Sequence, residues 1–184
     1  MAESNITKKA LAQSLKKLMC KKRVSQISIS EICDGCSLNR KSFYYHFKDK
    51  YDLVNWIFDT EIAEALSEDK TLPSERLSIL CTYFYDNKAF YRKALSEVGQ
   101  NSFSEHFHQK LFDLLKLRIQ EAFPEDEITS YQVGFITDAV VAAFRRWLLS
   151  SDCMTAKEFQ TQVLKCLQLA VRSKFAQEEV KKYL

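Results

Sequence analysis

The chain has 184 residues, of which only three are glycine and two are proline. Doubly wound α/β folds need glycine at their phosphate loops, and β-sandwiches and barrels need a turn about every ten residues, so this composition argues against both classes. Hydrophobic residues make up 46% of the chain, which is enough for a sizeable core. Since no apolar run approaches the roughly 18 residues of a membrane span and no hydrophobic signal core follows the N-terminus, we expect a cytoplasmic protein of long helices and short turns, with no membrane partner.

The net charge of +3 hides an asymmetry along the chain. Residues 1–60 hold eleven Lys and Arg against six Asp and Glu, whereas the remainder holds sixteen against eighteen. A basic first third on a slightly acidic remainder is typical of proteins that bind a polyanion such as DNA. A solvated, lysine-rich helix face gives the same distribution and stays open as an alternative.

The six cysteines are expected to be reduced, buried thiols, because they lie mostly among apolar neighbours and the chain has no export signal. Cys33 and Cys36 have the spacing of half a zinc site. A zinc site takes four ligands, and the sequence contains no second CxxC and no His pair at metal spacing. Burial in the core is therefore favoured over a metal or redox function for this pair, and we expect no metal and no cofactor.

The first third of the chain has the pattern of three helices. Hydrophobic residues at helical spacing predict a helix over 5–22. Ser28 followed by Glu31 is a capping box, which predicts a second, short helix that ends near Gly35. After a tight turn, Asn39 can cap a third short helix. A long helix followed by two short ones is the arrangement of a helix-turn-helix unit.

The third helix carries side chains suited to the major groove of DNA. Arginine binds guanine with both arms, lysine and serine reach base edges or phosphate, and phenols and histidine anchor the strand. The predicted DNA-binding residues of this region are Asn39, Arg40, Lys41, Ser42, Tyr44, Tyr45, His46 and Lys50. Each has a simpler explanation as well, since a tyrosine can be half-buried in the core, a histidine can cap the end of a helix, and Arg40 and Lys41 can be solvated.

The rest of the chain is also predicted to be helical. A fourth helix over about 49–67 connects the expected DNA-binding domain, 1–50, to a helical dimerisation and effector domain, 51–184. Further helices are expected from Pro73, around 90–95, and over 103–122, 128–150 and 155–182. The fold class is therefore all-α, with about nine helices and no strand.

The two last expected helices, 128–150 and 155–182, carry more apolar residues than one core-facing stripe needs. Gly134 and three nearby alanines allow another helix to approach closely. Two such helices from each subunit would form the four-helix interface of a homodimer. A fully buried helix in a monomer core has the same composition.

Aromatic residues with a few polar tips recur between positions 83 and 147. They suit a small-molecule effector pocket, and they suit an ordinary helical core equally well. The candidate pocket residues are Tyr83, Phe84, Tyr91, Phe107, Phe112 and Trp147.

The segments Ile29-Ser-Glu-Ile32 and Phe43-Tyr-Tyr-His-Phe47-Lys-Asp-Lys50-Tyr-Asp-Leu53 resemble the DNA-binding signature of TetR-type transcriptional regulators, in a match from residue 6 to about 66. The resemblance implies an all-helical homodimer that binds palindromic, double-stranded operator DNA, with additional contacts from Ser28 and Ser30. The family usually has glycine in the turn of the motif, where this chain has Ser37.

Two later segments, Phe144-Arg-Arg-Trp-Leu148 and Met154-Thr-Ala-Lys-Glu158, resemble the subgroup related to regulators of dihydroxyacetone kinase operons. Most members of the wider family are repressors that a small molecule releases from DNA, and this is the leading expectation. The alternative is an activator that works with a protein coactivator, as in some members of the subgroup. An enzyme is not expected, because the sequence has no glycine-rich phosphate loop, nucleophile elbow, HExxH motif or paired carboxylates. A helical adaptor whose basic head binds another protein is a further alternative.

Overall fold

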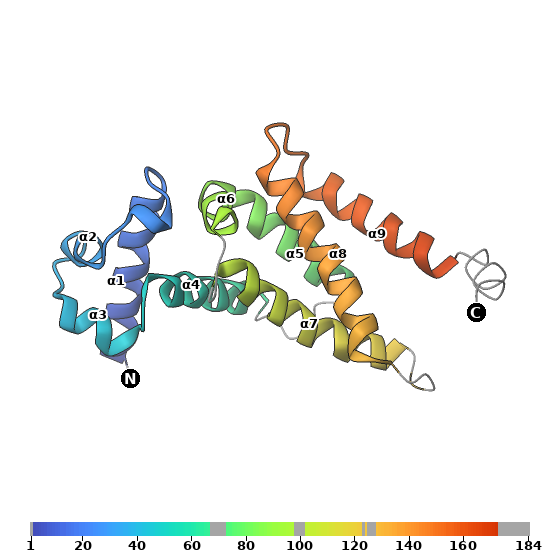
Figure 1. Ribbon diagram of the computed structural model, residues 1–184, viewed down its shortest axis with the longest axis horizontal. Coiled ribbons are helices and arrows are strands. Elements are labelled where there is room, and N and C mark those ends of the chain that lie inside the picture. The colour runs from blue at the N-terminus through green and yellow to red at the C-terminus, as the bar shows by residue number, and fades with distance from the viewer. Residues whose placement is uncertain (1, 67–72, 98–101, 123, 125–127, 173–184) are drawn as a thin grey trace.

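The computed structural model describes residues 2–66, 73–97, 102–122, 124 and 128–172. This part of the chain consists of helices joined by turns and contains no strand, as predicted, and none of its helices combines the length and the apolar character of a membrane span. Its helices are α1 (Ala2–Met19), the 3-10 turn η1 (Val24–Gln26), α2 (Ile29–Asp34), α3 (Arg40–His46), α4 (Lys50–Ala65), α5 (Pro73–Asp86), α6 (Lys88–Ser96), α7 (Phe103–Ala122), α8 (Ser130–Leu149) and α9 (Ala156–Arg172) (Figure 1).

The helices form two groups joined by α4 (Figure 1). The head consists of α1, α2 and α3, which contact one another, and the body consists of α5 to α9. Leu15, Ile32 and Phe43, one from each helix of the head, are fully buried. Burying a side chain of this size stabilises a fold by about 1.5–3 kcal/mol, so these contacts hold the two short helices against α1.

Side-chain caps set where the helices of the head begin. The Ser28 hydroxyl accepts from the backbone N–H of Glu31, and the Glu31 carboxylate accepts from the backbone N–H of Ser28, which confirms the predicted capping box. The Asn39 side chain caps α3, as predicted, and Asp49 caps α4. Each such cap is worth about 1 kcal/mol, which matters for helices of six and seven residues.

Ser37 and Gly35, at the turn between α2 and α3, have different structural roles. Ser37 has a φ of 56°, the left-handed conformation that glycine normally supplies, whereas Gly35 has an ordinary helical φ of −65°. A Cβ on Gly35 would lie 2.3 Å from Oγ of Ser14 on α1. Glycine is therefore needed at 35 for the close packing of α2 on α1, and serine makes the turn itself.

Several sequence-based expectations differ from the structure at helix ends. The first helix ends at Met19 rather than at residue 22. The eighth begins at Ser130, because the Thr129 side chain caps it by accepting from the backbone N–H of Gln132. The end of the expected helix 155–182 lies beyond the described residues.

The prediction of buried cysteines was right for only some of the thiols. All six are free; Cys33 and Cys81 are buried, whereas Cys20 and Cys166 are exposed and the other two are half-buried. Cys20 is exposed because it lies just after the end of α1. Burial raises the pKa of Cys81 to about 12, so this thiol stays protonated. Within the described ranges, no group of three or more His, Cys, Asp or Glu side chains has the geometry of a metal site.

Candidate DNA interface

Helix α3 has a buried side and an exposed side. Phe43 and Phe47 are 0% and 3% exposed and pack in the head, while Tyr44 and Tyr45 are 51% and 83% exposed. Arg40 and Lys41 are exposed as well. A short helix held by two phenylalanines therefore presents cations and phenols outward, which is the composition that contacts bases and phosphates.

The exposed side chains of α3 are partly ordered by one another. The Arg40 guanidinium lies over the Tyr44 ring, 6.0 Å from its centroid, and the Tyr44 ring meets Phe43 edge-on at 5.5 Å. Neither Arg40 nor Lys41 forms an ion pair with a carboxylate of the described residues. Their charges are therefore available to bind DNA. Because the contact with Tyr44 already restricts the Arg40 side chain, Arg40 loses less conformational entropy when it binds.

The polar residues at the starts of α2 and α3 act as caps in the structure. Asn39 Oδ1 accepts from the backbone N–H of Ser42 at 2.8 Å and from its hydroxyl at 3.1 Å. The Ser28 hydroxyl accepts from the backbone N–H of Glu31 and donates to the Glu31 carboxylate. These contacts leave the Asn39 NH₂ group for DNA, and Ser30 is exposed at the second position of α2. The half-buried His46 lies in the last turn of α3, against the Tyr45 ring at 4.9 Å.

Lys50 has a structural role that sequence reasoning missed. Its ammonium group donates to the carbonyl oxygen of Ser25 at 2.9 Å and to that of Ile27 at 2.8 Å. Desolvation by burial lowers the pKa of this group. Since an ammonium has three N–H donors, Lys50 can fix the segment before α2 and still offer one donor to a phosphate.

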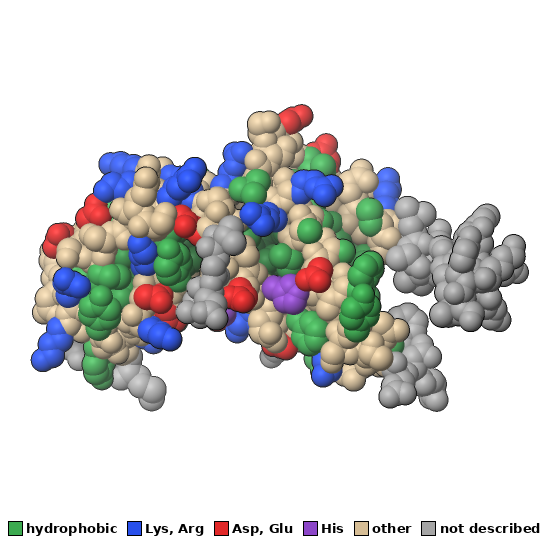
Figure 2. Space-filling view, in the orientation of Figure 1, with side chains coloured by type: hydrophobic (Ala, Val, Ile, Leu, Met, Phe, Trp, Pro, Cys, Tyr) green, Lys and Arg blue, Asp and Glu red, His purple; other side chains and the backbone are tan. Residues whose placement is uncertain are grey.

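Charged side chains are spread over the head rather than gathered in one block. Figure 2 shows Lys and Arg at several places along the visible surface of the head, with acidic, hydrophobic and uncharged side chains between them. One of the lysines, Lys22, is neutralised by an ion pair with Glu31.

The predicted effector residues do not all come together. Tyr83, Phe84, Tyr91 and Phe107 form one cluster, in which the Phe84 ring lies 4.7 Å from Tyr91 and 5.1 Å from Phe107. Phe84, Tyr91 and Phe107 are fully buried, so these rings pack directly against one another as a core.

Of the other two predicted effector residues, Phe112 lies apart from this cluster, whereas Trp147 joins it through Phe144, whose ring is 5.9 Å from Trp147 and 5.4 Å from Phe84. Trp147 stacks on Phe159 at 4.0 Å, and Phe112 stacks on His108 at 6.5 Å. The effector pocket therefore stays a prediction. The four predicted rings that meet pack directly against one another.

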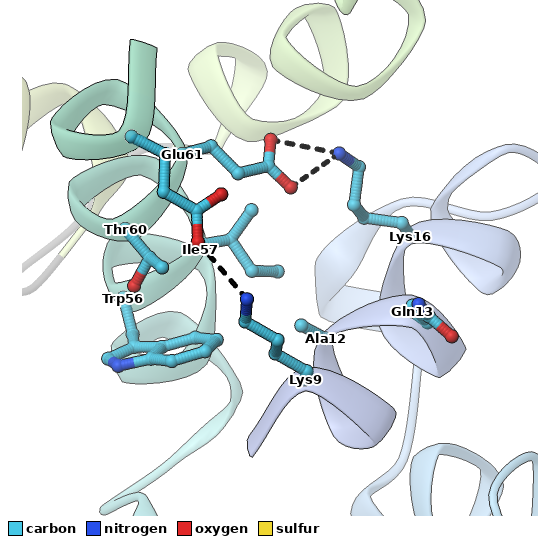
Figure 3. A pocket seen from close by; sticks show the side chains of 9 residues that line it. Lys9, Ala12, Gln13, Lys16, Trp56, Ile57, Thr60 and Glu61 are labelled. Carbon is cyan, nitrogen blue, oxygen red and sulfur yellow. Dashed lines mark hydrogen bonds and ion pairs between the residues drawn. The ribbon is translucent and has the colours of Figure 1, made fainter. Parts of the chain in front are cut away.

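A cavity of about 150 Å³ lies elsewhere, between α1 and α4. Two ion pairs cross it, Lys9 with Glu64 at 3.1 Å and Lys16 with Glu61 at 2.8 Å (Figure 3). None of the six predicted effector residues lines it. Sequence reasoning missed this site because its partners are 55 and 45 residues apart in the chain.

The expected dimer helix α8 carries an exposed apolar surface. Tyr131 and Phe135 are 82% and 68% exposed. Ala139 and Ala142 are exposed one and two turns further along the helix. Two large, solvated hydrophobic side chains beside small residues are what a self-complementary interface needs.

Comparisons with known proteins agree with this architecture. Residues 73–168 match a TetR family model described as "Transcriptional regulator C-terminal region". The chain is 33% identical over 109 residues to the dhaKLM operon transcriptional activator DhaS of Lactococcus lactis. That match covers 58% of this chain and only 57% of the length of DhaS.

Solved structures of regulators share the fold. A structure of the dihydroxyacetone kinase operon activator DhaS has a TM-score of 0.65 at 24% identity, covering 91% of this chain and 97% of that one. A TetR/AcrR-type regulator from Aquifex aeolicus has a TM-score of 0.59 at 18% identity, with 89% and 99% covered. NalD, the secondary repressor of the MexAB-OprM efflux pump in Pseudomonas aeruginosa, has a TM-score of 0.54 at 18% identity, with 89% and 94% covered. The chain therefore belongs to the TetR family, whose members are transcriptional regulators and not enzymes.

Proposed function

We propose that this regulator is a homodimer that binds palindromic operator DNA through α3 and activates transcription together with a protein coactivator. The observation that carries the proposal is the two-sided α3, with Phe43 and Phe47 buried and Arg40, Lys41 and Tyr44 exposed. In this proposal residues 1–50 are the DNA-binding domain and residues 51–184 mediate dimerisation and regulation.

The contacts with DNA divide into two kinds. Arg40 and Lys41 lie in the first turn of α3, where a recognition helix meets base edges, and we assign them to base recognition. Asn39, Ser42 and Tyr44 are assigned to either bases or phosphates. The residues assigned to phosphates alone flank this turn, and they are Ser28, Ser30, Tyr45, His46 and Lys50.

Dimerisation is assigned to α8 and α9. The exposed Tyr131 and Phe135 would be covered by the same helices of a second subunit. Covering them removes a large apolar area from water, and a two-fold axis would then place the two α3 helices on the two half-sites of a palindrome.

Activation has more support than repression by ligand release, which was the leading expectation from the sequence. The relative that is 33% identical is an activator, whereas NalD, a repressor, shares only the fold at 18% identity. Four of the six aromatic rings expected to line an effector pocket also pack against one another. By the same similarity, we propose genes of dihydroxyacetone metabolism as targets.

Selection of bound fragments from the source genome, followed by transcription assays on the selected promoters, tests this function. We expect a palindromic operator and more transcript when regulator and coactivator are both present. The logarithm of the affinity should fall with the logarithm of the salt concentration by about 0.9 per phosphate contact. Binding that is indifferent to salt would contradict DNA binding, and reduced transcript would contradict activation.

A further inference from the structure

A cavity and a groove adjoin one another between α1 and α4, and the proposed function uses neither of them. The cavity has a volume of about 150 Å³ and the groove a volume of about 640 Å³. A cavity of about 150 Å³ is large enough for a molecule the size of benzene, with about six non-hydrogen atoms. Four residues line both spaces, so a longer ligand can extend from one into the other: Lys9, Trp56, Thr60 and Glu64.

The charges around the cavity balance. Helix α1 contributes Lys9 and Lys16, and α4 contributes Glu61 and Glu64. Figure 3 shows the two lysines on the α1 side, with their ammonium groups directed toward the side chains of α4. An anion in the cavity would meet two carboxylates, and a cation would meet two ammonium groups. The electrostatics of the lining therefore favour a ligand without net charge.

The hydrogen-bonding groups of the lining favour hydroxyl groups on that ligand. The ammonium group of Lys9 only donates and the carboxylate of Glu64 only accepts, whereas the Gln13 amide and the Thr60 hydroxyl do both. A ligand hydroxyl also donates and accepts, so it can bind to either side of the cavity without breaking an ion pair. A zwitterion would instead compete with the two ion pairs for the same charges.

The rest of the lining is apolar and well packed. Ile57 is 1% exposed and Ala12 is 7% exposed, so they form a closed floor. The Trp56 ring meets Phe47 edge-on at 5.7 Å, and the Lys8 ammonium lies 5.8 Å from its centroid. A fixed aromatic ring and an apolar floor beside polar groups are typical of small-molecule sites, and they suit the carbon chain of a polyol.

One of the two ion pairs is fixed before a ligand binds. Lys16 bonds both oxygens of Glu61, at 2.8 and 3.0 Å, and Glu61 also accepts from the Tyr83 hydroxyl at 2.8 Å. The pair of Lys9 with Glu64 is more exposed, with side chains 58% and 61% accessible, and exposed pairs are weak. This outer pair can therefore open to admit a ligand, while the inner pair needs no reorganisation.

We propose that the cavity between α1 and α4 binds a small, uncharged polyhydroxy compound. Its hydroxyl groups bind Thr60, Gln13 and the charged side chains, while its carbon chain lies against Trp56 and Ile57. None of the six aromatic residues predicted to line an effector pocket belongs to this site. The inference goes beyond the proposed function and does not depend on it, because binding is measured on the regulator alone.

Titration with glycerol and with erythritol, followed by NMR of the tryptophan indole N–H groups, tests the inference. The chain has two tryptophans, and Trp147 is the internal control, because its indole donates to the carbonyl oxygen of Met154 in the body. We expect a saturable shift of the Trp56 signal and none of the Trp147 signal. Lactate, ethylenediamine and alanine, which are an anion, a cation and a zwitterion of similar size, should each bind at least about fivefold more weakly than glycerol.

Two variants test the assigned contacts. Thr60→Val removes a hydroxyl and keeps the shape of the side chain, so it should weaken glycerol binding about twofold to tenfold. Glu64→Gln leaves the lining with one net positive charge, so it should strengthen lactate binding relative to glycerol by about twofold to fivefold. Lys22→Met is the matched control, because it removes another exposed lysine–glutamate pair of α1, with Glu31, that lines neither the cavity nor the groove.

Thermal unfolding confirms that each variant is folded before affinities are compared. If Thr60→Val does not fold, Glu64→Gln decides, because its side chain is exposed. The inference is overturned if neither polyol gives a saturable shift of Trp56, if Trp147 shifts equally, or if lactate binds as tightly as glycerol. Unchanged glycerol binding in Thr60→Val, or weaker binding in Lys22→Met, also contradicts it. Since these measurements contain no DNA, failure of the proposed function is detected separately, by the operator selection.

Discussion

Replacing Ser37 by glycine should stabilise the head. Ser37 is the one non-glycine residue with a positive φ among the described residues. The left-handed conformation costs an ordinary residue roughly 1–2 kcal/mol, which glycine does not lose. The greater flexibility of glycine in the unfolded chain reduces this gain in stability by about 0.5–1 kcal/mol. The net gain in the free energy of unfolding should thus be about 0.5–1 kcal/mol, or a rise of about 1–4 °C in Tm for a protein of this size.

The matched substitution at the neighbouring glycine should have the opposite effect. In Gly35→Ala the new Cβ would lie 2.3 Å from Ser14 Oγ, which is buried and donates to the carbonyl oxygen of Ile32 at 2.7 Å. Moving Ser14 away breaks that bond and leaves the carbonyl oxygen of Ile32 with only the weaker thiol donor of Cys36, at 3.4 Å, which costs about 0.5–1.5 kcal/mol. Urea unfolding of both variants measures the two effects.

A double-mutant cycle identifies the cause of the loss at Gly35. Ser14→Ala removes the hydroxyl and keeps the Cβ of residue 14, which lies 3.3 Å from the Cβ that alanine would place at position 35, a contact that a small shift relieves. Gly35→Ala should therefore cost less in the Ser14→Ala protein than in the wild type. Equal costs in both backgrounds, or a loss of stability in Ser37→Gly, would refute the division of functions between the two positions.

Three further substitutions test other parts of the structure. Arg40→Ala should weaken operator binding by about 1–3 kcal/mol without changing Tm, as measured by competition with non-specific DNA, because this exposed residue holds no core. Phe135→Glu should convert the proposed dimer into a monomer in sedimentation experiments, since a charge would replace an exposed apolar contact. Hydrogen bonds from Lys22 and Ser28 lower the pKa of Glu31 from 4.5 to about 2. Because this pKa is depressed in the folded state, the stability advantage of wild type over Glu31→Gln should be complete above pH 4.5 and disappear as the pH falls toward 2.

The tyrosine pair of α5 and α6 gives a fifth prediction, in which the two hydroxyls are not equivalent. Tyr83→Phe leaves the hydroxyl of the fully buried Tyr91 without its acceptor, which should cost about 1–3 kcal/mol in urea unfolding. Tyr91→Phe should cost less, since Tyr83 still donates to Glu61. Equal losses would contradict the direction of donation in this network.

Features that depend on nearby residues could be predicted from the sequence. The two sides of α3 follow from Phe43 and Phe47, which are four residues apart, and from the cap at Asn39. The capping box of α2 needs only Ser28 and Glu31, three residues apart. Both patterns involve residues within one or two helical turns, so the structures they predict do not depend on how the rest of the chain packs.

Features that depend on distant residues could not be predicted. Lys50 was expected at a phosphate, and its bonds to Ser25 and Ile27 appear only once loop and helix are packed together. The aromatic residues around Phe84 were compatible with a pocket or a core, because both need the same composition. Only the ring distances, such as 4.7 Å between Phe84 and Tyr91, show that these rings fill the space.

This division between local and distant signals has a consequence for how the regulator can change. The side chains that we assign to base recognition lie on α3, whose form is set locally by its cap and its buried phenylalanines. Substitutions at Arg40 or Lys41 should therefore alter which bases are bound without altering the spacing of half-sites.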